Sequence, residues 1–376
     1  MSSALTDLFP YPIVQAPMAG GVSVPRLAAA VSEAGGLGFL AAGYKTADGM
    51  YQEIKQLRGL TSRPFGVNLF LPQPETPGAA TGSAGAADAV PFNAAAVDVY
   101  AHQLAGEAAW YETELGDPDC GRDDGYDTKL AVLLDNPVPV VSFHFGVPSR
   151  EVVDSLHRVG TFALVGATTA DEARAVEQSG ADAVIAQGVE AGGHQGTHRD
   201  NPETGGAGTG LLSLVAQVRE AVNLPIVAAG GIMRGTQIAA VLAAGASAAQ
   251  LGTAFLATPE SGAHDLHKQA LTNPLFVRTE LTRAFSGRPA RALVNRFLRE
   301  HGPYAPAAYP EVHHLTAPVR RAAAKAGDAQ GMALWAGQGH RMARELPAGQ
   351  LVEVLAAELA AAGTALSGYA AGGGAR

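Results

Sequence analysis

The chain of 376 residues contains a single cysteine, Cys120, so it can form no internal disulfide bond and has no Cys-x-x-Cys pair for a metal or a redox reaction. Charged residues make up only 16% of the sequence, and no basic cluster interleaved with aromatic side chains is present. The net charge of -9 argues further against a nucleic-acid-binding surface. The scarcity of cysteine fits a reducing compartment, and we expect a cytoplasmic location.

Long hydrophobic runs are also missing. No uninterrupted stretch of about 18 apolar residues occurs, so the sequence predicts no membrane-spanning segment. Residues 1–12 contain Asp7 and no apolar run, which argues against a signal peptide. The sequence lacks the Gly-x-Gly-x-x-Gly dinucleotide motif, the Walker loop and the Gly-x-Ser-x-Gly elbow. Enzymes that depend on those three motifs are therefore disfavoured.

Short apolar runs alternate with helical segments along most of the chain. Such an alternation is typical of α/β proteins, and eight repeats predict a parallel (β/α)8 TIM barrel. An open, doubly wound sheet is the structural alternative. The helix expected at residues 46–60 begins after Thr46, a residue type that caps helices well. The expected strands are residues 13–19, 37–42, 65–70, 138–143, 162–166, 183–186, 225–229 and 249–251.

The chain is longer than a barrel requires, since a barrel of this kind needs about 250 residues. The surplus lies at about residues 72–135 and after residue 257. We therefore expect a barrel over residues 1–257 with an insertion at 72–135, and a smaller, mainly helical substrate-binding cap over 258–376, whose closing helices return to the barrel. Helices are expected near residues 97–114, in part of 281–300, and at 350–362.

The sixth expected strand leads into the most informative segment of the sequence. Its apolar residues 183–186 are followed by Gln187 and then by Gly192, Gly193 and His194. The two glycines lack side chains and leave room for a flat group against the backbone. An imidazole can accept a proton near neutral pH, so His194 is the first candidate for a catalytic base.

The last two expected strands both end in glycine and small polar residues. Gly230 and Gly231 follow one strand, and Gly252 and Thr253 follow the other. The loops after the seventh and eighth strands of a barrel often bind phosphate through free backbone N–H groups. These four residues are therefore candidate phosphate ligands, although glycines can also serve only to tighten the turns.

Further candidates for a cofactor site lie at the ends of the first, third and sixth strands. Met18, with residues 19–21 after it, would form a low wall against a planar ring, and Ala16 and Pro17 are further candidate cofactor contacts. Asn68 and Gln187 could form hydrogen bonds with the polar edge of the ring. A polar ring system carried on a phosphate describes a mononucleotide such as FMN.

Histidines also occur at the end of the fourth expected strand and as a pair near the C-terminal part of the chain. His144 lies at the end of the fourth strand between two phenylalanines, so it is either a second catalytic candidate or a packed core histidine. His313 and His314 have no carboxylate or cysteine at the spacing of a metal site, and we predict no bound metal.

The chain resembles the nitronate monooxygenases of the FMN-dependent bacterial and fungal type, formerly called 2-nitropropane dioxygenases. The resemblance covers roughly residues 10 to 340 and extends beyond the barrel into the expected cap. It fits less clearly at residues 76–90 and 304–314. The segments that carry it are 15–21, 66–70, 141–146, 190–194, 228–232, 250–255, 286–291 and 335–339.

This resemblance implies a fold, a cofactor and a reaction. It implies that FMN is bound and that alkyl nitronates, notably propionate 3-nitronate, are oxidised by O2 to an aldehyde, here malonic semialdehyde, with nitrite and nitrate. It also implies that His194 matches the catalytic histidine. By the same resemblance, the FMN-binding positions are Asn68, Gln187, Gly192, Gly231, Gln250, Leu251, Gly252 and Thr253.

Several alternatives remain open at this point. An FMN-dependent enoyl-acyl-carrier-protein reductase would share the barrel, the phosphate loops and a Gly-Gly-His loop. A flavin-free phosphate-binding barrel, such as a sugar-phosphate isomerase, and a non-catalytic ligand-binding protein are the others. The expected partners are a small nitronate or nitroalkane and O2, with no nucleic acid and no membrane, and a homodimer is the assembly considered.

Overall fold

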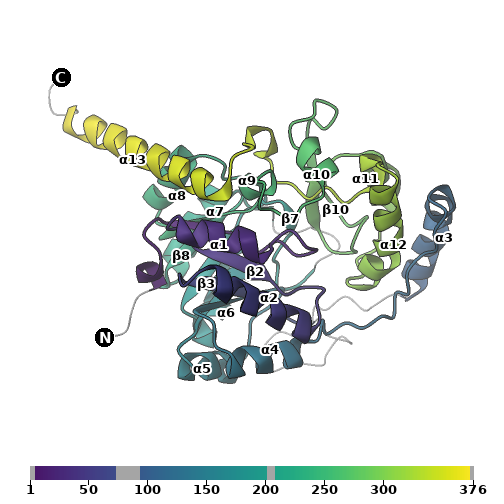
Figure 1. The fold of residues 1–376 in the computed structure, drawn as a ribbon, viewed down its shortest axis with the longest axis horizontal. Coiled ribbons are helices and arrows are strands. Elements are labelled where there is room, and N and C mark those ends of the chain that lie inside the picture. Colours follow the sequence, from purple (N-terminus) through teal and green to yellow (C-terminus); the bar gives the residue numbers. More distant parts are fainter. Residues whose placement is uncertain (1–4, 73–93, 201–207, 373–376) are drawn as a thin grey trace.

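The computed structural model describes residues 5–72, 94–200 and 208–372 (Figure 1). Its main sheet has eight parallel strands in the order β1-β9-β8-β6-β5-β4-β3-β2. A parallel bridge between Val14 and Leu37 joins the two ends of this sheet, so the sheet curls into a barrel. The predicted (β/α)8 barrel is therefore confirmed, and the open doubly wound sheet is not. The strands are β1 Ile13–Gln15, β2 Gly38–Ala41, β3 Phe65–Phe70, β4 Val140–His144, β5 Phe162–Ala167, β6 Ala183–Gln187, β8 Ile226–Ala229 and β9 Ala248–Leu251.

Amphipathic helices cover the outside of the barrel. The predicted cap of α2 is confirmed, because the Thr46 side chain accepts a hydrogen bond from Gly49 N at 3.0 Å. The apolar faces of these helices pack on the outward side chains of the strands, and together they form the largest core of the molecule. The helices are α1 Pro25–Glu33, α2 Ala47–Leu60, α4 Tyr126–Asp135, α5 Arg150–Arg158, α6 Ala170–Ser179, α7 Leu211–Ala221 and α8 Gly235–Ala243.

The inside of the barrel changes character along its axis. At one end, Phe39, Val140 and Ile185 pack with Leu5 and Phe9 of the N-terminal segment, which includes the 3-10 helix η1 Leu5–Leu8. Successive residues of a strand point to opposite faces, so inward positions recur every second residue. Polar residues follow these apolar ones at the same spacing: Ser142 two residues after Val140, Gln187 two after Ile185, and Gln250 two after Ala248. The C-terminal mouth of the barrel is therefore polar inside.

A second, smaller layer lies beside the barrel mouth and has its own apolar core. It contains an antiparallel sheet in the order β10-β11-β7, formed by Thr279–Thr282, Ala290–Leu293 and Gly193–His194. The prediction of a helix within residues 281–300 is correct only for its last part, because most of that segment forms β10, β11 and their connection. Helix α9, Thr253–Leu256, follows β9 and packs Ala254 and Phe255 into the barrel core. The helical elements after it are α10 Asp265–Ala270, α11 Arg296–His301, η3 Gly302–Tyr304, α12 Glu311–Lys325, η4 Ala329–Gly331 and η5 His340–Met342.

The helix predicted near residues 97–114 is observed as α3, Ala94–Trp110. In Figure 1 it lies next to α12 and far from the barrel helices that precede and follow it in sequence. Its Tyr100 and Leu104 belong to the same apolar core as Phe297 of α11. Arg296 of α11 also forms a hydrogen bond with Glu107 of α3, at 2.9 Å from Nη2 to Oε2. Helix α3, which is part of the predicted insertion at residues 72–135, therefore belongs to the cap. Residues 73–93 of that insertion lie outside the described ranges.

The C-terminal helix α13, Ala348–Gly372, packs on α8 and α1 of the barrel, as Figure 1 shows. Leu351, Val352 and Leu355 are buried in the barrel's outer core. Across the residues that the structure describes, no helix has the length and apolar character needed to cross a membrane. The division into two units at residue 257 stays a prediction.

Candidate active site

The segment that carries His194 is held by Gln187 of β6 and by strand β11. Gln187, at the end of β6, donates from Nε2 to His194 O at 3.1 Å and accepts from Gly196 N at 2.6 Å. Gly193 and His194 form strand β7, which pairs antiparallel with Arg291 and Ala290 of β11. Both ends of the Gln187 amide are thus used to hold the protein backbone. Binding of a cofactor ring by Gln187 stays a prediction, while its contact with the His194 segment is observed.

The His194 ring lies between the barrel and the cap. Its Nε2 is 2.8 Å from Ser286 Oγ, and its ring centroid is 5.4–5.8 Å from those of Phe145, Tyr309 and Trp335. Burial, together with the positive charges of Arg288 and Arg320, lowers the pKa of His194 to about 3. The ring is therefore neutral across the physiological pH range, and a neutral imidazole has one nitrogen free to accept a proton.

His144 faces the barrel interior together with Asn68 and Ser142. Asn68 and Ser142 are paired in register, and Asn68 Nδ2 lies within 3.1 Å of Ser142 O, Ser142 Oγ and His144 Nδ1. Because the amide donates to Nδ1, the neutral His144 ring carries its proton on Nε2. Burial and the charges of His198 and Arg288 lower the pKa of His144 to about 4. His144 is thus an inward-facing, hydrogen-bonded residue, and its catalytic function stays a prediction.

The candidate phosphate residues come together at neighbouring strand ends, because β8 pairs with β9. Gly230 and Gly231 have φ of 141° and 67°, conformations that favour glycine. A Cβ at Gly231 would lie 3.0 Å from Glu190 Cβ, so this glycine also permits close packing of the adjacent loop. Thr253 Oγ1 accepts a hydrogen bond from Gly337 N at 2.9 Å. Gly231 and Thr253 therefore have structural contacts besides any contact with phosphate.

The first strand places its end beside the last one. Ala16 N donates to Leu251 O at 2.9 Å, and a Cβ at Gly252 would lie 3.5 Å from Ala16 Cβ and 3.8 Å from Met18 Sδ. Ala16, Pro17 and Met18 are half-buried. Ala16 and Met18 are therefore next to Gly252 of the predicted phosphate loop, as a single mononucleotide site requires.

Two buried polar atoms at this end of the barrel have no hydrogen-bond partner among the residues that the structure describes. They are Oε1 of Gln250 and Nε2 of Gln195. Buried polar atoms are nearly always paired, and each unpaired one calls for an explanation. Gly193 adds open space next to His194, since a Cβ there would meet no atom within 4 Å. These residues fit a polar heterocycle such as that of FMN.

Sequence reasoning missed several residues that surround His194. Tyr44 and Phe145 follow strands β2 and β4 and have φ of 65° and 74°, which is unusual for residues other than glycine. Strained backbone of this kind gathers at functional sites. The Tyr44 hydroxyl lies 3.1 Å from that of Tyr309, and the Arg288 guanidinium lies 4.1 Å from the Phe145 ring centroid. Their position after strand ends was the available signal for Tyr44 and Phe145.

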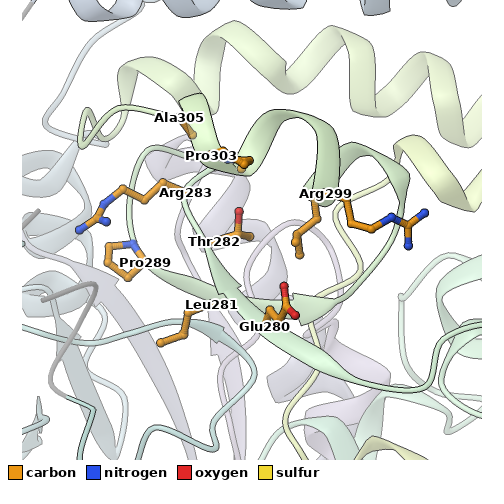
Figure 2. Close-up of a pocket in the computed structure, with 10 residues that line it drawn as sticks. Glu280, Leu281, Thr282, Arg283, Pro289, Arg299, Pro303 and Ala305 are labelled. Atoms are coloured by element: carbon orange, nitrogen blue, oxygen red, sulfur yellow. The ribbon is translucent and has the colours of Figure 1, made fainter. Parts of the chain in front are cut away.

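A cleft within the cap is lined by other residues (Figure 2). It has a volume of about 430 Å³ and is bounded by β10, the loop between β10 and β11, α11 and η3. Arg283 at its edge is already paired with Asp200, at 2.6 Å. None of the predicted site residues lines this cleft. The lining residues include Glu280, Leu281, Thr282, Arg283, Pro289, Arg299, Pro303 and Ala305.

Comparisons with a family model and with a curated relative point to the same family. The family model described as "Nitronate monooxygenase" matches residues 2–358. A nitronate monooxygenase of Pseudomonas aeruginosa is 45% identical over 360 residues, which is 93% of this chain and 96% of the relative.

Two solved structures extend the comparison. A nitroalkane oxidase from Streptomyces ansochromogenes is 80% identical, with a TM-score of 0.91, and the match covers 97% of this chain and all of that one. FabK from Thermotoga maritima is 30% identical, with a TM-score of 0.70, over 97% of this chain and 98% of that one. These matches show that the chain belongs to the nitronate monooxygenase family.

Proposed function

We propose that this oxidoreductase is an FMN-dependent nitronate monooxygenase that oxidises alkyl nitronates, such as propionate 3-nitronate, with O2. The expected products are an aldehyde, malonic semialdehyde for that substrate, with nitrite and nitrate. The observation that carries the proposal is a neutral His194, held by Ser286, at a polar barrel mouth with unpaired amide atoms. Membership of the nitronate monooxygenase family supports it.

Several groups of this chain suit FMN. Backbone N–H groups of the loops at Gly230–Gly231 and Gly252–Thr253 would hold the phosphate, and Gln250 Oε1 would accept a hydrogen bond from the ring system. Asn68 would offer its carboxamide oxygen, since the described contacts use only its nitrogen. When bound, FMN would supply the redox chemistry between the organic substrate and O2.

The contacts of Ser286 determine what His194 can do. The Ser286 hydroxyl donates a hydrogen bond to Arg288 O at 3.3 Å. Ser286 Oγ is then free to accept from His194 Nε2–H, and this tautomer leaves the lone pair on Nδ1. In the proposed reaction, Nδ1 removes the α-proton of a neutral nitroalkane. A nitronate has already lost that proton, so His194 would only position it.

Oxidation of neutral nitroalkanes is the second candidate function. The 80% identical relative is a nitroalkane oxidase. A neutral His194 has a free ring nitrogen that can accept a proton from carbon, and its lowered pKa makes it a weaker base than an ordinary histidine. The enoyl-acyl-carrier-protein reductase activity has less support. The matching family model and the 45% identical relative are both described as nitronate monooxygenase, and the 80% identical structure is a nitroalkane oxidase.

The purified enzyme and its His194→Asn variant test the proposal with two substrates. The released cofactor should be FMN, identified by chromatography after acid treatment. With nitroethane, the variant should lose about 10²–10⁴-fold in kcat/KM, because the α-proton has no acceptor. With preformed ethyl nitronate, a substantial rate should remain, because no proton must be removed from carbon.

His144→Asn is the matched control for this experiment, because it changes the other histidine at the barrel mouth. A wild-type enzyme that oxidises neither substrate, or that contains FAD or no flavin, would refute the proposed function. Equal losses on both substrates in His194→Asn would show that His194 positions the nitro group and is not a base. If only His144→Asn lost activity, the base would be His144.

Two further parts of the proposal rest on the sequence. A cytoplasmic location is inferred from the scarcity of cysteine, and it stays a prediction. A homodimer likewise stays a prediction, to be tested by light scattering of the purified protein.

A further inference from the structure

Arg320, on α12, is a half-buried cation with no carboxylate partner among the described residues. Its Nε donates to Thr316 Oγ1 at 3.1 Å, and its Nη2 donates to His313 O at 2.9 Å and contacts His313 Nδ1 at 3.3 Å. Its Nη1 forms no hydrogen bond with a described residue. Burial lowers the pKa of Arg320 to about 10, so the guanidinium still carries its charge at neutral pH.

The groups around Arg320 do not balance that charge. The His313 ring stacks on Tyr44, with centroids 3.9 Å apart and an angle of 7°. Burial raises the pKa of Tyr44 to about 12 and that of Tyr309 well above its usual value, so both phenols stay protonated. The carboxylate of Asp124, which also acts on Tyr44, is paired with Lys129 at 2.7 Å. A half-buried charge without a counter-ion is partly desolvated, and an anionic ligand would offset that cost.

His313 supplies a second unpaired donor next to this cation. Arg320 donates to His313 Nδ1, so the neutral ring carries its proton on Nε2, which has no partner among the described residues. Burial and the charge of Arg320 lower the pKa of His313, which keeps the ring uncharged. One charged donor and one neutral donor thus lie side by side.

Arg320 and His313 lie near His194, and neither forms a hydrogen bond with it in the described contacts. The charge of Arg320 acts on His194, but less than that of Arg288, and no hydrogen bond joins Arg320 to His194. Tyr44 and Tyr309 connect the two places: Tyr44 stacks on His313 and contacts the Tyr309 hydroxyl, and the Tyr309 ring lies 5.6 Å from that of His194. An anion bound at Arg320 is therefore separate from a nitro group held at His194.

We propose that Arg320 and His313 form an anion subsite that binds the carboxylate tail of the substrate, and that this subsite selects carboxylate-bearing nitronates over simple alkyl nitronates. The inference rests on the proposed function and names the substrate class of the same site. Two observations carry it: the half-buried guanidinium, which has no carboxylate partner among the described residues, and the adjacent imidazole N–H.

Arg320→Met tests the subsite, because methionine keeps much of the volume and removes the charge. KM for propionate 3-nitronate should rise about 10–100-fold, with kcat nearly unchanged, because a charge-assisted hydrogen bond is lost. KM for ethyl nitronate, which has no carboxylate, should change less than about threefold. Arg321→Met is the matched control, because it removes an exposed cation from the next position of the same helix.

Binding of succinate gives a readout that does not need turnover. Succinate places a carboxylate where propionate 3-nitronate has its nitro group, and its binding to the holoenzyme can be followed by fluorescence of Trp335, whose ring lies 5.4 Å from that of His194. Arg320→Met should weaken succinate binding about tenfold or more. This result would stand even if the nitronate reaction were absent, so failure of the subsite and failure of the proposed function are distinguishable.

Three results would overturn the subsite. Equal KM increases for both nitronates in Arg320→Met would make Arg320 part of the general fold. Loss of FMN in this variant, with FMN retained in Arg321→Met, would assign Arg320 to the cofactor. Acetate binding as tightly as succinate would indicate a site for any small anion, not for a substrate tail.

Discussion

At the scale of single residues, the pair of His194 and Ser286 is the contact with the clearest chemical consequence. Ser286 is fully buried and lies 2.8 Å from His194 Nε2. Ser286→Ala should lower kcat on nitroethane about 3–10-fold, because one neutral hydrogen bond no longer fixes the ring and its tautomer. The rate on ethyl nitronate should fall much less. Steady-state kinetics on both substrates measures the difference.

Ser179→Ala is the control for that variant, since it removes a buried serine hydroxyl from α6, where the hydroxyl donates to Val176 O. Its kinetic constants should match those of the wild type. An equal loss on the two substrates in Ser286→Ala would contradict the tautomer argument and leave Ser286 a packing residue.

Residues at strand ends were predictable from the sequence, and residues brought in by the cap were not. Asn68, Gln187 and Gln250 are polar side chains in or after apolar strands, and the parallel barrel necessarily gathers them at one mouth. Arg320 and Tyr309 reach the same place from the cap. No local pattern shows which face of α12 meets the barrel, so their positions depend on long-range packing.

At the scale of elements, the contact between α8 and α13 ties the end of the chain to the barrel. Gly235 begins α8, and its N donates to Glu358 Oε2 at 2.7 Å. A Cβ at this position would lie 2.3 Å from Leu355 O, in the backbone of α13. Gly235→Ala should therefore lower the free energy of unfolding by about 1–3 kcal/mol, because one of the helices must shift. Urea denaturation measures the change.

Gly363→Ala provides the comparison, because it lies in α13 and a Cβ there would meet no atom within 4 Å. Alanine is the better helix former, so this variant should be more stable by about 0.5–1 kcal/mol. If Gly235→Ala were as stable as the wild type, the close packing of α13 on α8 would not contribute to stability.

Elements with a clear apolar run were predicted closely, as in β3, whose bounds Phe65–Phe70 agree with the expected strand. The helix expected in part of residues 281–300 is present as α11, but strands β10 and β11 were not predicted, and this has a physical cause. Strand β10 has the sequence Thr-Glu-Leu-Thr and β11 the sequence Ala-Arg-Ala-Leu, so each is a four-residue strand interrupted by a charged side chain. They are held by pairing with each other and, for β11, with β7. Such strands depend on partners that are distant in sequence.

At the scale of the whole molecule, buried neutral histidines make stability depend on pH. Burial lowers the pKa of His267 to about 4, whereas an unfolded histidine has a pKa of about 6.5. Below pH 6.5 the unfolded chain binds more protons than the folded one, so stability falls as the pH decreases from about 6.5 to about 4. Above pH 6.5 this group has little effect. The same direction holds for His144 and His194.

His267→Gln tests this dependence, because glutamine retains an N–H for the bond to Trp335 O and does not titrate. The loss of unfolding free energy between pH 7 and pH 5 should become smaller by about 1–2 kcal/mol. The same change at the exposed His102 should leave the loss as it is in the wild type. An unchanged pH dependence in His267→Gln would show that His267 is not the source.

The strand pairing of β7 with β11 has a consequence for building hybrid enzymes. His194 precedes residue 257 in sequence, yet its backbone is paired with Ala290 and its ring with Ser286. Gly192 also fits closely against the cap, since a Cβ there would lie 2.4 Å from Gly337 N. A chimaera joined at residue 257 would combine a histidine from one parent with the strand that aligns it from another. The exchangeable unit is therefore the C-terminal segment together with residues 187–196, grafted as one piece.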